Sequence, residues 1–266
     1  MGDSETGQVS ADAARIYEDF YRPALFEQWP PLVIEAARIQ IGHRVLDVAC
    51  GTGVLTRAVA KRVGSEGLAV GIDNNAGMLD VAREKAPEIE WQQASAEALP
   101  LEDDSFDCVV SQFGLMYFED RQCTLQEMMR VLRPGGNLAI VVWDKLENSP
   151  GHTAEDRLWQ RLFGDEAADE VPDSLGDQNT LQRLFASAGI CDADIRTHEG
   201  TARLPSISAW MHAGIKGWTE ADEIDDAQYE LLMKEAEQDL ARFVTADGSV
   251  SFATPAHFVT ASKPSN

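Results

Sequence analysis

The sequence predicts an α/β fold, a doubly wound and mostly parallel sheet of seven strands flanked by helices. Near-continuous apolar runs at 45–49, 68–73 and 106–111 are typical of strands buried on both faces. Helical patterns separate these runs, which is the order that a parallel sheet requires. The first run ends in Gly51-Thr52-Gly53, a turn that lets a ligand approach the backbone closely.

The N-terminal region, 1–40, is expected to form a helical lid. Its first ten residues are small and polar, which is typical of a disordered end. Two helices should follow, and Pro30-Pro31 should start the second. The lid contains the aromatic residues Tyr17, Tyr21 and Trp29. Their side chains either contact a ligand or pack in the core.

The remaining elements of the sheet follow in a regular order. Helices are expected at 55–63, 78–86 and 125–132, and further strands at 89–93 and 137–143. The turn Arg133-Pro134-Gly135-Gly136 should precede the last of these strands. The core should therefore comprise 41–145, 180–204 and 246–266.

A helical cap is expected before the last strand. Strands at 193–204 and 250–262 should form a terminal pair, and a helix at 181–188 should precede them. The cap should comprise 146–179 and 205–245, with helices near 207–217 and 225–244. The cap contains His152, Trp210, Met211 and Trp218. Their side chains either face a substrate or pack between helices.

Charge and composition exclude several classes of partner. The chain has 45 acidic and 22 basic residues, a formal net charge of -23. Such a field repels nucleic acid and anionic membranes. No apolar run approaches the ~20 residues of a membrane span, so we expect a cytoplasmic protein, a monomer or a homodimer. The acidity indicates either adaptation to a salty cytoplasm or simple solubility.

Cysteine and histidine patterns argue against a metal site. Cys50, Cys108, Cys123 and Cys191 lack C-x-x-C spacing and are expected to be buried, reduced thiols. The five histidines are scattered without an i, i+4 pair, so no metal is expected.

The glycine turn and Asp73 together indicate a nucleotide-type ligand. Thr56 stands where a dinucleotide fingerprint has its third glycine, so the usual NAD pattern is incomplete. Asp73 ends the second strand about 20 residues after the turn, where an acid accepts ribose hydroxyls. The alternative is that Asp73 caps the following helix.

Several motifs in the sequence, taken in order, resemble those of a known family. The motifs are Val45-Leu46-Asp47-Val48-Ala49-Cys50-Gly51-Thr52-Gly53, Asp73, Ser95-Ala96-Glu97-Ala98-Leu99-Pro100, Ser105-Phe106-Asp107 and Val131-Leu132-Arg133-Pro134-Gly135-Gly136. In this order they resemble the class I S-adenosylmethionine-dependent methyltransferases. Phe113-Gly114-Leu115 is similar to the branch of ubiquinone/menaquinone C-methyltransferases. The resemblance covers about 44–143.

The resemblance implies a role for each matching residue. Ala49, Gly51, Thr52 and Gly53 would hold the methionine part of S-adenosylmethionine, while Asp47 would support the loop and the amino group. Asp73 would bind the ribose, Ser95 and Ala96 the adenine, and Gln112 would lie near the sulfonium. The flanking residues that we also expect at the cofactor are Cys50, Asn74, Met78, Glu97 and Phe113.

The implied reaction is methyl transfer to a small, apolar or aromatic metabolite, with S-adenosylhomocysteine as product. Alignment and exclusion of water supply most of the catalysis in such a displacement. Tyr117, His152 and Tyr21 are the candidates for a general base. The alternatives are an NAD-dependent oxidoreductase and a non-catalytic regulatory protein that binds S-adenosylmethionine.

Overall fold

The computed structural model describes residues 10–164, 174–217 and 225–265. Its centre is a seven-stranded sheet with the strand order β3-β2-β1-β4-β5-β9-β6. The strands are β1 (Arg44–Val48), β2 (Leu68–Asp73), β3 (Glu90–Gln93), β4 (Phe106–Gln112), β5 (Leu132–Trp143), β6 (Asp194–His198) and β9 (Ala256–Ser262). From β3 to β5 neighbouring strands are parallel, whereas β9 runs antiparallel to β5 and β6. The expected fold class is confirmed.

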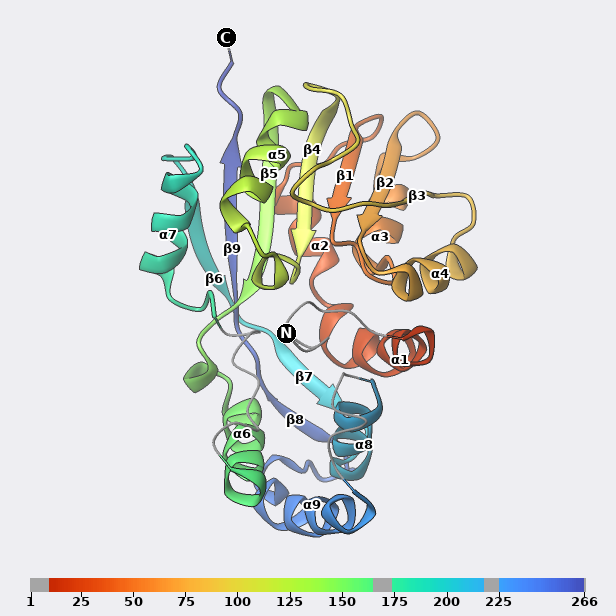
Figure 1. Cartoon of the computed structure of the whole chain (residues 1–266), viewed down its shortest axis with the longest axis vertical. Helices are drawn as coiled ribbons and strands as arrows, with labels where there is room; N and C mark the ends of the chain where they lie inside the picture. The colour runs from red at the N-terminus through yellow and green to blue at the C-terminus, as the bar shows by residue number, and fades with distance from the viewer. Residues whose placement is uncertain (1–9, 165–173, 218–224, 266) are drawn as a thin grey trace.

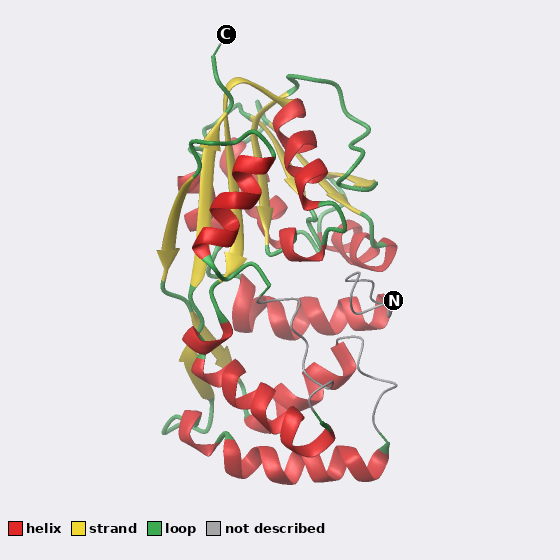
Figure 2. Ribbon diagram, turned by 60° about the vertical axis from the view of Figure 1, so that its left-hand side comes forward, coloured by secondary structure: helices red, strands yellow, loops and turns green. Residues whose placement is uncertain are grey.

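Helices cover both faces of the sheet (Figures 1 and 2). One face carries α2 (Pro30–Ala36), α3 (Val54–Val63) and α4 (Ala76–Lys85), and the other carries α5 (Arg121–Val131) and α7 (Gln178–Ser187). The chain changes faces between β1 and β4, which are neighbours in the sheet. Ligands of open α/β sheets bind at the carboxyl edge of such a switch point.

Buried apolar side chains explain why the central strands form. In β1, Val45, Leu46 and Val48 are buried, and β4 buries Val109 and Val110. A strand between two helical layers is apolar on both faces, so these runs are near-continuous rather than alternating. The main core therefore lies on both sides of the sheet.

The β5 strand begins earlier than its sequence indicates. Residues 133–136 were expected to form a turn, but the ladder with β4 already begins at Leu132. A register shift follows, because Phe106 pairs with Leu132 whereas Cys108 pairs with Asn137. The expected turn is therefore an irregularity within the strand.

The expected terminal strands are each divided between two sheets. A second sheet pairs β7 (Thr201–Leu204) with β8 (Val250–Ala253), which continue β6 and β9 beyond the main sheet. Pro255 stands at the division on the β8–β9 side, where it has no N–H to donate to a ladder. The expectation of one continuous pair was wrong in this respect.

The helical cap lies beyond the carboxyl edge of the main sheet (Figure 1). It contains α6 (Pro150–Phe163), α8 (Ile207–Gly217) and α9 (Asp226–Asp239), next to β7 and β8. Trp218 lies outside the described residues. None of the helices within the described ranges is both long and apolar enough to span a membrane.

The N-terminal helices lie between the sheet and the cap (Figure 2). Ser10 caps α1 (Ala11–Ile16) by accepting the N–H of Ala13 at 3.2 Å. The chain continues as the π-helix η2 (Tyr17–Phe26), which contains Pro23. In an α-helix the proline ring clashes with the carbonyl four residues before it, and a wider turn relieves this clash. Since α1 contacts both α4 and α8, it joins the core to the cap.

Candidate functional site

The glycine turn after β1 leaves open space for a ligand. Gly51 and Gly53 have φ values of 54° and 86°, in the left-handed region that favours glycine. A Cβ on Gly53 would collide with the ring of Trp91, whereas one on Gly51 would meet nothing within 4 Å. Gly53 therefore turns the chain into α3, and Gly51 exposes its backbone.

Asp73 lies directly beside this turn. One of its carboxylate oxygens accepts the Gly51 N–H and the other accepts the Asn75 N–H, each at 2.8 Å. Burial raises the pKa of Asp73, and these backbone N–H groups oppose the rise. Asn75, and not Asp73, caps α4 by accepting the N–H of Met78, so the capping alternative was wrong. A carboxylate has about four lone-pair positions, which leaves some for ligand hydroxyls.

Asp47 brings a second buried carboxylate to the site. Its Oδ2 accepts the hydroxyl of Thr56 at 2.6 Å, which explains why threonine stands at the place of a third glycine. Its Oδ1 is buried and has no hydrogen-bond partner among the described residues. Burial raises the pKa of Asp47 to about 7, and the hydrogen bond from Thr56 opposes the rise. A cationic ligand group would satisfy Oδ1.

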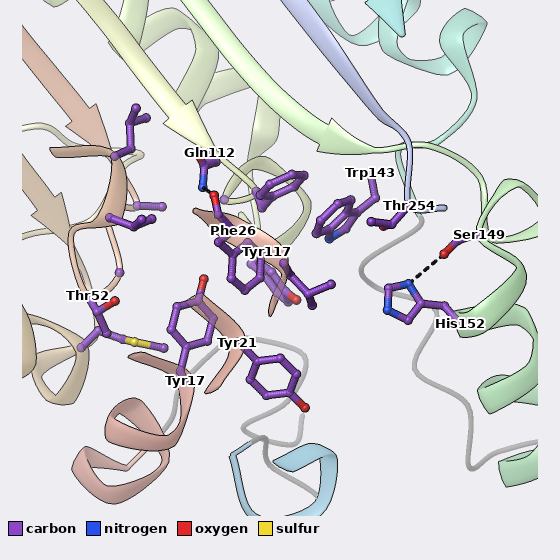
Figure 3. Close-up of a pocket in the computed structure, with 18 of the residues that line it drawn as sticks. Tyr17, Tyr21, Phe26, Thr52, Gln112, Tyr117, Trp143, Ser149, His152 and Thr254 are labelled. Carbon is purple, nitrogen blue, oxygen red and sulfur yellow. Dashed lines mark hydrogen bonds between the residues drawn. The ribbon is translucent and has the colours of Figure 1, made fainter. Parts of the chain in front are cut away.

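A cavity of about 320 Å³ extends from the glycine turn to the cap (Figure 3). The expected site residues that line it are Tyr21, Asp47, Ala49, Cys50, Gly51, Thr52, Asp73, Asn74, Met78, Gln112, Phe113, Tyr117 and His152. A second cavity of about 210 Å³ shares Asp73 with the first and is lined by Ser95, Ala96 and Glu97. The fold thus brings the expected cofactor residues together around two adjoining spaces, apart from Gly53.

Two polar side chains at these cavities differ in whether they have a polar atom available for a ligand. The amide oxygen Oε1 of Gln112 is buried without a partner among the described residues, while Nε2 donates to the Phe26 carbonyl at 3.3 Å. The hydroxyl of Ser95 bonds to the carboxylate of Glu97. A ligand at Ser95 would therefore meet a paired hydroxyl.

Aromatic rings form one wall of the larger cavity. Phe113 has a φ of 58° at the end of β4, and its ring stacks on Trp143 with centroids 3.7 Å apart. Trp29 packs behind them, edge-on to both rings, and is fully buried. Tyr17 and Tyr21 line the cavity as expected for ligand contact, but Trp29 is a core residue. Burial raises the pKa of Tyr17, which keeps its phenol protonated.

Glu18, a residue of η2 that no sequence motif singles out, ties the N-terminal helices to the glycine turn. It is 3 % exposed and accepts the hydroxyl of Thr52 at 2.6 Å and the guanidinium of Arg57 at 2.8 Å. Arg57 also donates to the Thr52 carbonyl. A lone acid in an amphipathic helix normally indicates a solvated face, so the sequence held no signal for this role.

The candidates for a general base come from separate elements. Tyr21 belongs to η2, Tyr117 to η3 (Leu115–Tyr117) and His152 to α6. The ring of His152 lies at the opposite side of the cavity from Thr52 (Figure 3). Burial lowers its pKa to about 4, so the imidazole is neutral at physiological pH.

The remaining expectations concern two cap residues, the cysteines and a metal site. Trp210 lines it, but Met211 is buried at 1 % exposure and packs in the core. Cys50 and Cys108 are buried as expected, whereas Cys123 is partly exposed and Cys191 exposed. Cys191 follows α7 in a loop, where no layer covers it. Among the described residues no three His, Cys, Asp or Glu side chains form a cluster that could hold a metal.

Comparison with solved structures supports the same fold. The YcgJ protein from Bacillus subtilis is 20% identical, with a TM-score of 0.58 over 90% of this chain and 99% of that one. The phosphoethanolamine N-methyltransferase 2 of Haemonchus contortus, solved with S-adenosyl-L-methionine, is 17% identical. Its TM-score is 0.60 over 98% of this chain and 59% of that one.

Sequence comparison identifies the family. The chain is 34% identical to the ubiquinone/menaquinone biosynthesis C-methyltransferase UbiE of Hahella chejuensis, over 71% of this chain and 84% of that protein. The model of the ubiE/COQ5 methyltransferase family matches residues 23–216. These matches support a methyltransferase over the two alternatives, an NAD-dependent oxidoreductase and a non-catalytic regulatory protein. The chain belongs to the ubiE/COQ5 methyltransferase family and is an S-adenosylmethionine-dependent methyltransferase.

Proposed function

We propose that this methyltransferase acts on a small, apolar or aromatic acceptor held between the sheet and the cap. The observation that carries the proposal is that the larger cavity joins the glycine turn to the stacked rings of Phe113 and Trp143. Flat apolar walls favour a flat apolar ligand. The relatives' names point to quinone biosynthesis, and a quinol ring has this character.

Different residues around the two cavities would bind the amino-acid end, the ribose, the adenine and the sulfur of the cofactor. The unpaired Oδ1 of Asp47 would accept the ammonium group, and the backbone at Gly51 would hold the amino-acid end. Asp73 would accept hydrogen bonds from the ribose, and Ser95 with Ala96 would frame the adenine. The partly negative amide oxygen of Gln112 suits a positively charged sulfur.

S-adenosylmethionine supplies an electrophilic methyl group on a cationic sulfur. The protein has to hold the acceptor in line with that methyl group and exclude water, which supplies roughly 7 kcal/mol or more. The lid bound by Glu18 and the aromatic wall serve these two purposes. Tyr21, Tyr117 and His152 line the space in which an acceptor proton would be taken up, and their role as general base stays a prediction.

The experiment that tests this proposal is incubation with a metabolite extract. The cofactor should carry a trideuteromethyl group, so that mass spectrometry detects each methylated product. We expect labelled products to be apolar or aromatic, with a demethylated quinol included as one defined substrate. An incubation of the extract and the labelled cofactor without the protein is the control for non-enzymatic methylation. Labelled products that are exclusively sugar phosphates or nucleotides would contradict the proposed acceptor class.

A further inference from the structure

The cap end of the cavity contains His152, whose ring nitrogen Nδ1 lies within hydrogen-bond distance of Ser149. Ser149 Oγ lies 3.0 Å from Nδ1 of His152 and 3.2 Å from the carbonyl oxygen of Ala253 in β8. A serine has one hydroxyl proton, and a carbonyl can only accept. When the Ser149 hydroxyl donates its proton to the carbonyl of Ala253, its oxygen can only accept a hydrogen bond from His152. Nδ1 of His152 then carries a proton and donates it to Ser149 Oγ.

This arrangement leaves a hydrogen-bond acceptor facing the cavity. In a neutral imidazole with a protonated Nδ1, Nε2 has a lone pair. Nε2 of His152 makes no hydrogen bond to any described residue. The ring is held edge-on by Phe252, with centroids 5.0 Å apart, and by Trp210 at 6.3 Å. Figure 3 shows the imidazole directed from α6 toward the cavity.

The charge of the cavity wall limits what this lone pair can bind. Asp144, Glu155 and Asp156 line the cap end of the cavity, and no lysine or arginine lines it among the described residues. A carboxylate or phosphate on the acceptor would face the Nε2 lone pair and would find no cationic partner among the described side chains that line the cavity. A hydroxyl or amino group would meet neither obstacle.

We propose that Nε2 of His152 binds a hydroxyl or amino group on the acceptor, remote from the methylated atom, and that acceptors with an anionic group there are rejected. This inference rests on the proposed function, because it assumes that the acceptor occupies the cavity. His152 is then a specificity-determining residue and not the general base, and Ser149 is a positioning residue that fixes the tautomer of His152. The neutral state of His152, whose pKa burial lowers to about 4, is the state that this role requires.

The binding experiment uses the full chain saturated with S-adenosylhomocysteine and a set of matched probes. Phenethylamine, 2-phenylethanol, phenylacetate and propylbenzene share a ring and differ at the end of the chain. Wild type should bind the amine and the alcohol more tightly than phenylacetate. In His152→Phe, the preference for 2-phenylethanol over propylbenzene should fall by about 2–10-fold, the value of one hydrogen bond. His212→Phe, an exposed residue of α8, is the control and should leave the preference unchanged.

The tautomer is measured separately by ¹⁵N NMR of histidine-labelled protein. Wild type should show a protonated Nδ1 and an unprotonated Nε2 for His152, and Ser149→Ala should lose this fixed tautomer. A protonated Nε2 in wild type, equal binding of phenylacetate and phenethylamine, or an unchanged preference in His152→Phe would each overturn the inference. Failure to bind S-adenosylhomocysteine would instead refute the cofactor assignment in the proposed function.

Discussion

At the scale of single residues, the site depends on two buried carboxylates with different partners. Asp73 has hydrogen bonds at both oxygens, whereas Asp47 has one bonded oxygen and one without a partner in the described chain. A buried charge is stable only when it is paired. Asp47 is therefore the carboxylate that gains most from a cationic ligand, and its charge state should control binding.

Affinity for S-adenosylhomocysteine should fall as the pH drops through about 7. Asp47 has a pKa near 7 in the free protein, so below that pH its carboxyl is mostly neutral and attracts an ammonium group less. Calorimetric titration across this range should show roughly tenfold weaker binding per pH unit on the acid side. Asp47→Asn should bind weakly with little dependence on pH. Wild-type affinity that stays constant across this range would contradict the assignment.

The ligand-free protein should respond to pH in the opposite sense. The folded-state pKa of Asp47 lies above the usual value of 3.8, so the folded state binds more protons than the unfolded state. Its contribution to the free energy of unfolding is complete below about pH 4 and is lost as the pH rises through about 7. Chemical denaturation without ligand, compared with Asp47→Asn, measures this contribution.

Thr56 should be needed for its hydroxyl and not for its shape. Thr56→Val removes the proton that Asp47 Oδ2 accepts, which should lower the free energy of unfolding by about 1–3 kcal/mol and weaken cofactor binding. Thr56→Ser keeps the hydroxyl and should retain most of the affinity. The sequence showed that a third glycine is absent. It did not show the reason, because the partner, Asp47, lies nine positions away across the turn.

At the scale of elements, the π-helix η2 is attached to the glycine turn through one buried acid. Glu18 contacts Thr52, Arg57 and Arg22, the last at 3.1 Å. Removing one partner of a buried ion pair leaves the other charge uncompensated, which costs far more than losing a surface pair. The lid should therefore loosen when Glu18 is changed.

Glu18→Gln should increase amide hydrogen exchange in α1 and η2 and weaken binding of S-adenosylhomocysteine. Loss of a buried pair is worth about 3–5 kcal/mol, some of which the amide recovers through hydrogen bonds. Glu84→Gln is the matched control, because its pair with Arg15 is half exposed and should contribute about 1 kcal/mol or less. Equal exchange in the two variants would contradict the attachment of the lid by Glu18.

Elements with a strong local pattern were predictable, and those shaped by distant contacts were not. The β1 and β2 strands have apolar runs that only a central strand accommodates, and Gly64 ends α3 as expected. The division of the terminal strands into two sheets depends on where the cap meets the core. No local pattern encodes that junction, so the sequence predicts one strand over 193–204.

At the scale of the whole molecule, the cavity is made by parts of the chain that are far apart in sequence. Tyr21 from the lid, Trp143 from the sheet and Trp210 from the cap meet around one space. The sequence identified the glycine turn and Asp73 because their spacing follows from one β-α-β unit. It offered His152 as a cap residue and a candidate general base, but it gave no signal for Ser149, whose placement at the cavity requires the assembled cap.

The overall charge should make stability depend on salt. With a net charge of -23, self-repulsion acts on the folded state and is screened as ionic strength rises. We expect the melting temperature to rise from low salt to molar KCl and then to level off, because the Debye length shrinks from about 10 Å to about 3 Å between 0.1 and 1 M salt. Sucrose, which screens no charge, is the control. Equal stability with and without molar KCl would favour solubility as the sole role of the acids.

The central claim, that an adenosine cofactor binds between Asp73 and the glycine turn, is tested most directly by calorimetric titration. Wild type should bind S-adenosylhomocysteine at one site and should not bind NAD. Asp73→Asn should weaken binding about 10–150-fold, since a hydrogen bond to a charged group is worth about 1.5–3 kcal/mol. Unchanged affinity in the folded variant, or binding of NAD in place of S-adenosylhomocysteine, would contradict the account.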